Sequence, residues 1–175
     1  MKENITTVIF DMYETLARND AGLWVHTFQR ICLAQNLNID AEKLWRQWKK
    51  LEVGFRRDRL NLEDPWNSPP FKSYEEAWRG CFSGVYKRLG LSGDPGAAAR
   101  MSVEALGMRE FYPDAVETLP KIQERWRTGL LSNADNDYLN PTLACLGMRF
   151  DAVLSSETAR AYKPHPGPFM QVMDL

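Results

Sequence analysis

The stretch Val8-Ile9-Phe10-Asp11-Met12-Tyr13-Glu14-Thr15-Leu16 decides the fold of this chain. An apolar, β-prone run from Ile5 to Phe10 stops abruptly at the carboxylate of Asp11. A strand of this kind is usually buried on both faces of an α/β sheet, and ligands bind at the carboxyl ends of such strands. A rigidly held carboxylate there can attack an electrophile and form a covalent ester or acyl phosphate. Alternatively, Asp11 only caps the turn that follows.

Composition narrows the class of protein. The 175 residues are 44% hydrophobic, which suits one domain with a smaller insert. Lys and Arg number 22 against 23 Asp and Glu, so neither nucleic acid nor an anionic membrane is expected as a partner. Residues 1–4 are too short for a signal peptide, and three scattered cysteines suggest free thiols rather than a zinc site. We therefore expect a cytoplasmic protein.

After Leu16 the hydrophobic pattern changes from strand to helix. Helical spacing covers residues 21–36 and 40–60, and a capping box at Ser73 begins a third helix. Residues 18–109 contain no convincing strand, so they are predicted to form a helical insert. Its tryptophans are expected to pack its own small core, although one or two could instead line an apolar pocket over Asp11. They are Trp24, Trp45, Trp48, Trp66 and Trp78.

Beyond Tyr112 the chain alternates between helices and strands. Strands are predicted at 128–132 and 151–155, with a helix before, between and after them. This alternation predicts an α/β fold with a doubly wound parallel sheet. The expected organisation is a discontinuous core, residues 1–17 and 110–175, interrupted by the insert.

Several motifs, taken in order, resemble those of the haloacid dehalogenase superfamily, and the L-2-haloacid dehalogenase branch in particular. The resemblance implies a Rossmann-like core, a helical cap formed by the insert, and an aspartate nucleophile. The motifs are Asp11-x-Tyr13-x-Thr15-Leu16, Leu44-Trp45-Arg46-Gln47 followed by Leu51-Glu52 and Arg56, Leu130-Leu131-Ser132-Asn133, Ser155-Ser156-Glu157, and Tyr162-Lys163-Pro164.

The residue two positions after the nucleophile discriminates between activities. Phosphatases of the superfamily carry a second aspartate there, which protonates the leaving alkoxide. This chain has Tyr13, whose reference pKa of about 10 suits that role poorly. A halide leaves unprotonated, so Tyr13 favours dehalogenation. Glu14 is either a solvated turn residue or a displaced general acid, and the second possibility keeps a phosphatase open.

The resemblance also implies roles for individual residues. Arg46 would stabilise the departing halide, although it could be an ordinary surface arginine. Lys163 would neutralise Asp11 or the bound intermediate, and Ser132 would bind an anionic group or cap the helix starting near Asp135. The predicted catalytic residues are Asp11, Thr15, Arg46, Ser132 and Lys163, and the predicted substrate contacts are Tyr13, Trp45 and Asn133.

The fourth motif of the family, a polar loop after one more strand, does not appear before Leu175. In the family that strand lies beside the first one, so residues 5–10 are expected to form an unpaired hydrophobic edge. We therefore expect either a truncated chain or a homodimer, with or without strand exchange, that completes the sheet from a second copy.

The leading functional hypothesis is hydrolysis of a small 2-haloacid through an aspartyl ester, without a cofactor. The first alternative is a Mg²⁺-dependent small-molecule phosphatase, with the ion held by Asp11 and the main chain of Tyr13. The second is a non-catalytic scaffold or fragment with the same fold.

Overall fold

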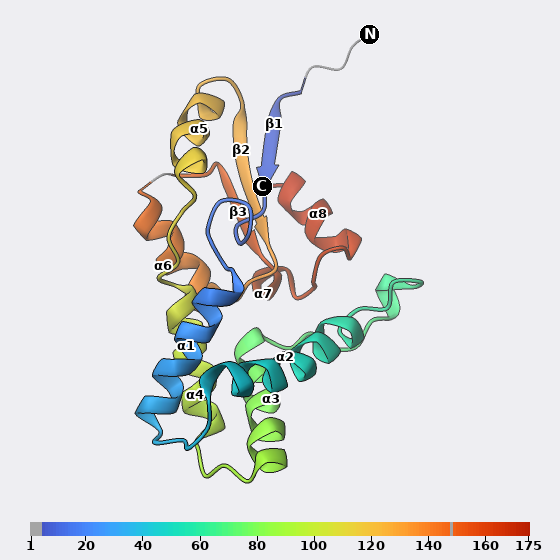
Figure 1. Cartoon of the computed structure of the whole chain (residues 1–175). Helices are drawn as coiled ribbons and strands as arrows, with labels where there is room; N and C mark the ends of the chain where they lie inside the picture. The colour runs from blue at the N-terminus through green and yellow to red at the C-terminus, as the bar shows by residue number, and fades with distance from the viewer. Residues whose placement is uncertain (1–4, 148) are drawn as a thin grey trace. The chain divides into compact units, whose positions relative to one another are not determined.

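A computed structural model describes residues 5–147 and 149–175. Residues 1–4, for which the sequence predicts no signal peptide, lie outside this part. The chain forms two compact units, shown in Figure 1. One unit holds the described residues up to Arg18 together with Gly107–Leu175, and the other is Asn19–Leu106.

The first unit contains a three-stranded parallel sheet, which confirms the predicted fold class. Its strands β1 (Thr7–Phe10), β2 (Arg127–Ser132) and β3 (Ala152–Ser155) lie in the order β1-β2-β3. Because β2 has a neighbour on each side, all of its residues except the first are buried. The pairing of Phe10 with Leu130 brings the carboxyl ends of β1 and β2 together.

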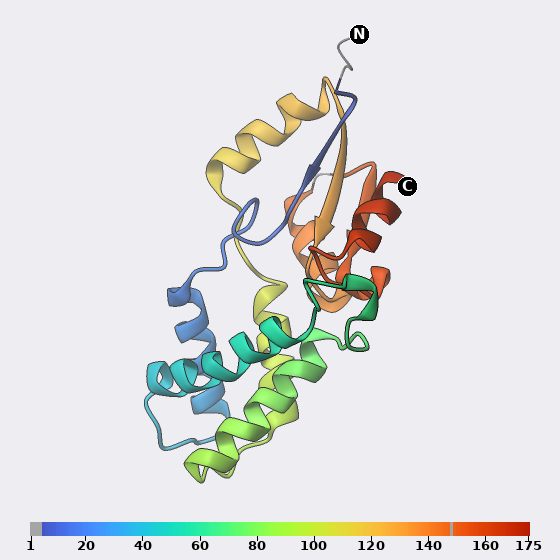
Figure 2. The same cartoon turned by 90° about the vertical axis from the view of Figure 1, so that its right-hand side faces the viewer.

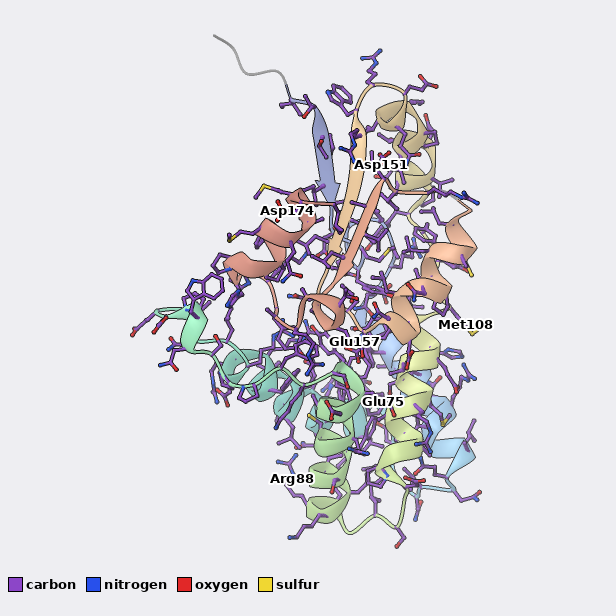
Figure 3. All side chains as sticks on the ribbon, turned by 180° about the vertical axis from the view of Figure 1, so that it is seen from behind. Glu75, Arg88, Met108, Asp151, Glu157 and Asp174 are labelled. Carbon is purple, nitrogen blue, oxygen red and sulfur yellow. The ribbon has the colours of Figure 1, made fainter. Side chains whose placement is uncertain are left out.

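Helices cover both faces of this sheet, as doubly wound topology requires. Figures 1 and 3 show helix α8 on one face and helices α5 and α6 on the other. Val172 of α8 packs with Leu131 and Leu154, and each such buried side chain contributes about 1.5–3 kcal/mol. The helices of this unit are α5 (Pro113–Gln123), α6 (Asn136–Leu146), α7 (Ser156–Ala159) and α8 (Pro166–Met173).

Strand β1 departs from the prediction of burial on both faces. Its residues alternate between exposed and half-buried, and Ile9 is 42% exposed. The reason is its place at the edge of the sheet, where β2 is its only neighbour among the described residues. The expectation of an unpaired apolar edge at this strand is therefore met.

The second unit is helical, and residues 19–106, all of them described, contain no strand. Figure 2 shows its helices, of which α2 and α3 run side by side. The side chains of Asp20, Asp40 and Ser73 each accept a hydrogen bond from the first turn of a helix, as capping residues do. The helices are α1 (Ala21–Ala34), α2 (Ala41–Asp58), α3 (Tyr74–Leu89) and α4 (Pro95–Leu106), with a short 3₁₀ turn at Pro65–Asn67.

An aromatic cluster forms the core of the helical unit. Trp24 lies 5.3 Å from Trp48 and 5.5 Å from Trp78 between ring centroids, and all three are buried. For these residues the prediction of a self-contained core is confirmed. For Trp66 it is wrong, because that side chain is 70% exposed beside a proline in the 3₁₀ turn.

Candidate active site

Asp11 and Lys163 meet at the carboxyl edge of the sheet. Asp11 follows β1 directly, and its Oδ1 lies 3.0 Å from the Nζ atom of Lys163. The carboxylate side chain is 43% exposed and the lysine side chain 19%, so the pair is open to solvent mainly on the aspartate side. Oδ1 also accepts a hydrogen bond from the main-chain N–H of Met12 at 2.8 Å. The carboxylate is thus oriented by both a charge and a main-chain donor.

Lys163 is itself held at two points, by Leu131 of β2 and by Asn133, which follows that strand. Its Nζ donates to the carbonyl oxygen of Leu131 at 2.6 Å. Its main-chain N–H donates to Oδ1 of Asn133 at 2.7 Å, and Nδ2 of Asn133 donates to its carbonyl oxygen at 3.1 Å. The sequence placed Asn133 among the substrate contacts. In the structure, both ends of its amide bind the main chain of Lys163.

The hydroxyl of Tyr13 is engaged by helix α6. It lies 3.0 Å from Oγ1 of Thr142 and 3.4 Å from the carbonyl oxygen of Tyr138. Burial raises the pKa of Tyr13 above its ordinary value, and the Thr142 hydrogen bond and the Arg109 charge oppose that rise only in part. A phenol that holds its proton this firmly is not suited to acid–base work near neutrality.

Glu14 and Thr15 belong to a tight turn after the candidate nucleophile. Glu14 has a φ of +63°, a left-handed conformation that favours glycine, and its N–H donates to Ala17 at 2.8 Å. The turn is closed further by the N–H of Leu16, which donates to the carbonyl oxygen of Met12 at 2.8 Å. Both Glu14 and Thr15 are exposed.

Ser132 is buried at the end of β2, opposite Ser155 of β3. The alternative that it caps the next helix is wrong, because Asp135 occupies the N-cap position of α6. Three residues lie between the end of β2 and the start of α6, and Asn133 is the first of them.

A polar network that the sequence did not predict joins the loops after β2 and β3. Oγ of Ser155 donates to Oδ1 of Asn136 at 2.7 Å, and the N–H of Asn136 donates to Oε2 of Glu157 at 2.7 Å. Nδ2 of Asn136 donates to Thr158 at 3.1 Å. Glu157, a residue of α7, is labelled in Figure 3. The Ser155-Ser156-Glu157 motif drew attention to two members of this network. Nothing in the sequence distinguishes Asn136 from any other asparagine in the first turn of a helix.

His165 is the N-cap of α8. Its Nδ1 accepts a hydrogen bond from the N–H of Gly167 at 2.9 Å, and the side chain is buried. It thereby fixes the start of α8 at Pro166, three residues after Lys163.

Arg46 and Trp45 lie on α2 of the helical unit. Arg46 is 67% exposed at its side chain and forms an ion pair with Glu42 at 2.5 Å. Trp45 is half-buried, with an indole nitrogen that is buried and has no hydrogen-bond partner among the described residues. Farther along the same helix, the fully buried Glu52 pairs with Lys49 at 2.8 Å and with Arg56.

Within the described residues, no three His, Cys, Asp or Glu side chains are grouped closely enough to hold a metal ion. A Mg²⁺ ion at Asp11 would therefore depend on main-chain oxygen, water or further residues. In the same part of the chain, no helix is long and apolar enough to cross a membrane.

The Asp11–Lys163 pair lies at the carboxyl edge of a parallel α/β sheet, which is where sheets of this kind bind their ligands. Residues 5–175 match the family model described as haloacid dehalogenase-like hydrolase. The chain belongs to that family of hydrolases.

Two curated relatives are dehalogenases. The chain is 29% identical over 169 residues to haloacetate dehalogenase H-2 of Moraxella sp. (strain B), covering 94% of the chain and 68% of the relative. It is 29% identical over 176 residues to the (S)-2-haloacid dehalogenase of Xanthobacter autotrophicus, covering 98% of the chain and 62% of the relative. The chain thus spans roughly two thirds of the length of these proteins.

The fold is also that of a solved relative. The structure of L-2-haloacid dehalogenase from Xanthobacter autotrophicus with chloropropionic acid covalently bound superposes with a TM-score of 0.70 at 24% identity. The match covers 98% of this chain and 64% of that one.

Proposed function

We propose that the protein containing this chain hydrolyses small 2-haloacids, with Asp11 as the nucleophile and no cofactor. The observation that carries the proposal is the exposed carboxylate of Asp11, 3.0 Å from the Lys163 ammonium at the carboxyl edge of the sheet. Two further findings support it: both curated relatives are dehalogenases, and one solved relative carries chloropropionic acid covalently bound.

The proposed reaction has two steps. A carboxylate oxygen of Asp11 forms a bond to the carbon that bears the halogen, and the halide leaves with the bonding electron pair. Water then adds to the side-chain carbonyl carbon of the resulting ester, releasing a 2-hydroxyacid and restoring Asp11. Holding the nucleophile beside the reacting carbon could by itself contribute about 7 kcal/mol or more.

Lys163 is proposed to bind the substrate carboxylate or to balance charge on Asp11. An ammonium group has three donors, and two of those of Lys163 face Asp11 and Leu131. The third remains for an anion. Ser132 and Thr15, at the ends of β2 and of the turn after Asp11, are proposed to bind the same anionic group.

We propose that the helical insert acts as a cap and that Arg46 receives the halide while Trp45 contacts the substrate. This assignment rests on the Leu44-Trp45-Arg46-Gln47 match and not on a distance to Asp11. The ion pair of Arg46 with Glu42 would have to open for this role, which a side chain that is 67% exposed permits. A cytoplasmic location is part of the same proposal.

The test is halide release from 2-chloropropionate and chloroacetate by the full natural protein in the presence of a chelator. Asp11→Asn should abolish release, because the amide is nearly isosteric but is not a nucleophile. Asp174→Asn, at an exposed carboxylate that ends α8, is the matched control and should retain the wild-type rate. Release that survives Asp11→Asn would exclude this aspartate as the nucleophile.

A single turnover in ¹⁸O-labelled water sharpens the test. If Asp11 attacks carbon, the first product hydroxyl contains unlabelled oxygen from the carboxylate, and the solvent label appears in Asp11. Label found directly in the product would mean that water attacks the substrate itself. Phosphate release that a chelator stops would instead support the phosphatase, and a folded protein inactive on both substrate classes would support a scaffold.

A further inference from the structure

The side-chain amide of Asn133 forms two hydrogen bonds to the main chain of a single residue, Lys163. Its Oδ1 accepts from the Lys163 N–H at 2.7 Å, and its Nδ2 donates to the Lys163 carbonyl oxygen at 3.1 Å. This is the donor–acceptor pairing that a neighbouring peptide group would offer in a sheet. The Asn133 side chain, just after β2, therefore holds the loop that contains Lys163, 30 positions away in the sequence.

We propose that Asn133 is a positioning residue, which acts on the reaction by holding Lys163 against Asp11. The proposal rests on the function proposed above, because it requires Lys163 to act in turnover. It gives a structural role to an amide that sequence resemblance had placed among the substrate contacts.

The geometry fixes Lys163 at both ends. The main chain of Lys163 is held by Asn133. Its Nζ atom is held by the carbonyl oxygen of Leu131, which lies two residues before Asn133. Phe10 of β1 pairs with Leu130 of β2, so the residues that follow them, Asp11 and Leu131, lie at the same level along the sheet. The short segment from Leu131 to Asn133, at the end of β2, thus positions both the main chain and the Nζ atom of Lys163 relative to the carboxylate of Asp11.

Only asparagine supplies this pairing without other change. Aspartate would keep the acceptor for the Lys163 N–H but would bring a carboxylate oxygen against the Lys163 carbonyl oxygen. Alanine would leave both main-chain groups of Lys163 to find water. In both variants the loop is free to shift, and a shift of about 1 Å in a catalytic group can reduce the rate on the order of 10²-fold.

The first experiment compares Asn133→Ala and Asn133→Asp with Asn136→Ala in the full natural protein. Asn136 is a matched control because it is an amide at the same sheet edge, whose hydrogen bonds go to Ser155 and Thr158 and not to Lys163. With 2-chloropropionate as substrate, both Asn133 variants should lower kcat by about 10²-fold with KM changed little. Asn136→Ala should lose stability but keep kcat within about threefold, since its partners lie outside the Asp11–Lys163 pair.

A double-mutant cycle with Lys163→Met separates positioning from substrate contact. If Asn133 acts through Lys163, adding Asn133→Ala to Lys163→Met should change kcat by less than about twofold. Losses that multiply, or a rise in KM alone, would overturn the proposal in favour of direct contact with the substrate.

Hydrogen exchange of the Lys163 amide, followed by NMR, tests the hydrogen bonds without any turnover. Exchange should be faster in Asn133→Ala and unchanged in Asn136→Ala. Unchanged exchange in Asn133→Ala would overturn the proposal. If the wild-type protein has no dehalogenase activity, faster exchange would still establish the bond, while the catalytic role of Asn133 would be rejected together with the proposed function.

Discussion

The hydroxyl of Tyr13 is bound to helix α6 and has a structural role beside the candidate site. In sequence, Tyr13 stands where a general acid would stand, two residues after Asp11. In the structure its oxygen lies 3.0 Å from Thr142 of α6, so the side chain joins the turn after β1 to that helix.

Tyr13→Phe should therefore affect stability more than turnover. Thr142 keeps its bond to the Tyr138 carbonyl oxygen at 2.8 Å, so no hydroxyl is left without a partner. We expect the free energy of unfolding to fall by about 1 kcal/mol, measured by urea titration, with kcat unchanged within a few-fold. A loss of turnover above about 10²-fold would instead indicate proton transfer by the phenol.

Glu14 holds a backbone conformation that costs a non-glycine residue about 1–2 kcal/mol. Glu14→Gly should raise the free energy of unfolding by up to about 1 kcal/mol, because the added freedom of the unfolded chain cancels part of the gain. Glu14→Ala removes the same carboxylate but keeps the Cβ atom, so it should show no such gain. If both variants lose turnover, the carboxylate is a general acid, and the phosphatase alternative gains support.

The Cys81 thiol makes stability depend on pH at the alkaline end. Burial, with a smaller effect from the negative charge of Glu52, raises its pKa from 9.0 to about 11. Between these values the unfolded chain loses a proton that the folded protein keeps, so the free energy of unfolding falls as pH rises. Below pH 9 this contribution is fully present. Urea titrations from pH 8 to about 10.5 should show a decline that is shallower in Cys81→Ala; identical slopes would exclude this thiol as a source.

At the scale of elements, the helical unit owes its boundaries to local capping. Ser73 and Glu76 form a complete capping box at the start of α3, and Gly90 ends the helix in a left-handed conformation. The sequence predicted this start because the signal lies within four neighbouring residues. The burial of β1 was not predictable in the same way, since it depends on which strands lie beside it.

Ser73→Ala should cost about 1 kcal/mol of stability, because the Glu76 N–H would lose its acceptor. Ser83→Ala, at an exposed interior position of the same helix, is the control and should be neutral or slightly stabilising. Thermal and urea unfolding of the two variants measure the change in stability that each substitution causes. Equal effects would mean that the capping box contributes nothing specific.

At the scale of the whole molecule, the chain is divided into two units with separate cores. In the helical unit, the rings of Phe28, Trp48 and Phe82 pack at centroid distances of 5.3–5.5 Å. Each unit therefore has its own source of hydrophobic stabilisation.

Residues 19–106 should consequently fold when produced alone. We expect helical far-ultraviolet dichroism, a near-ultraviolet signal from packed tryptophans, and cooperative unfolding in urea. Trp48→Ala, which removes a fully buried ring, should weaken that fragment by about 3–5 kcal/mol or unfold it. Helical dichroism without near-ultraviolet signal or cooperativity would show that the unit depends on the sheet.

The sequence by itself determined the order of helices and strands, the parallel sheet, the helix caps and the candidate nucleophile. These follow from hydrophobic period and from capping or turn residues, which act over a few neighbouring positions. Only the tertiary structure decided that Asn133 holds Lys163, that Tyr13 bonds to α6, and that β1 is half exposed. The physical reason is distance along the chain: the first two contacts join residues 30 and 129 positions apart, and the third depends on strand order. No local pattern encodes which of several polar groups will meet once the chain has folded.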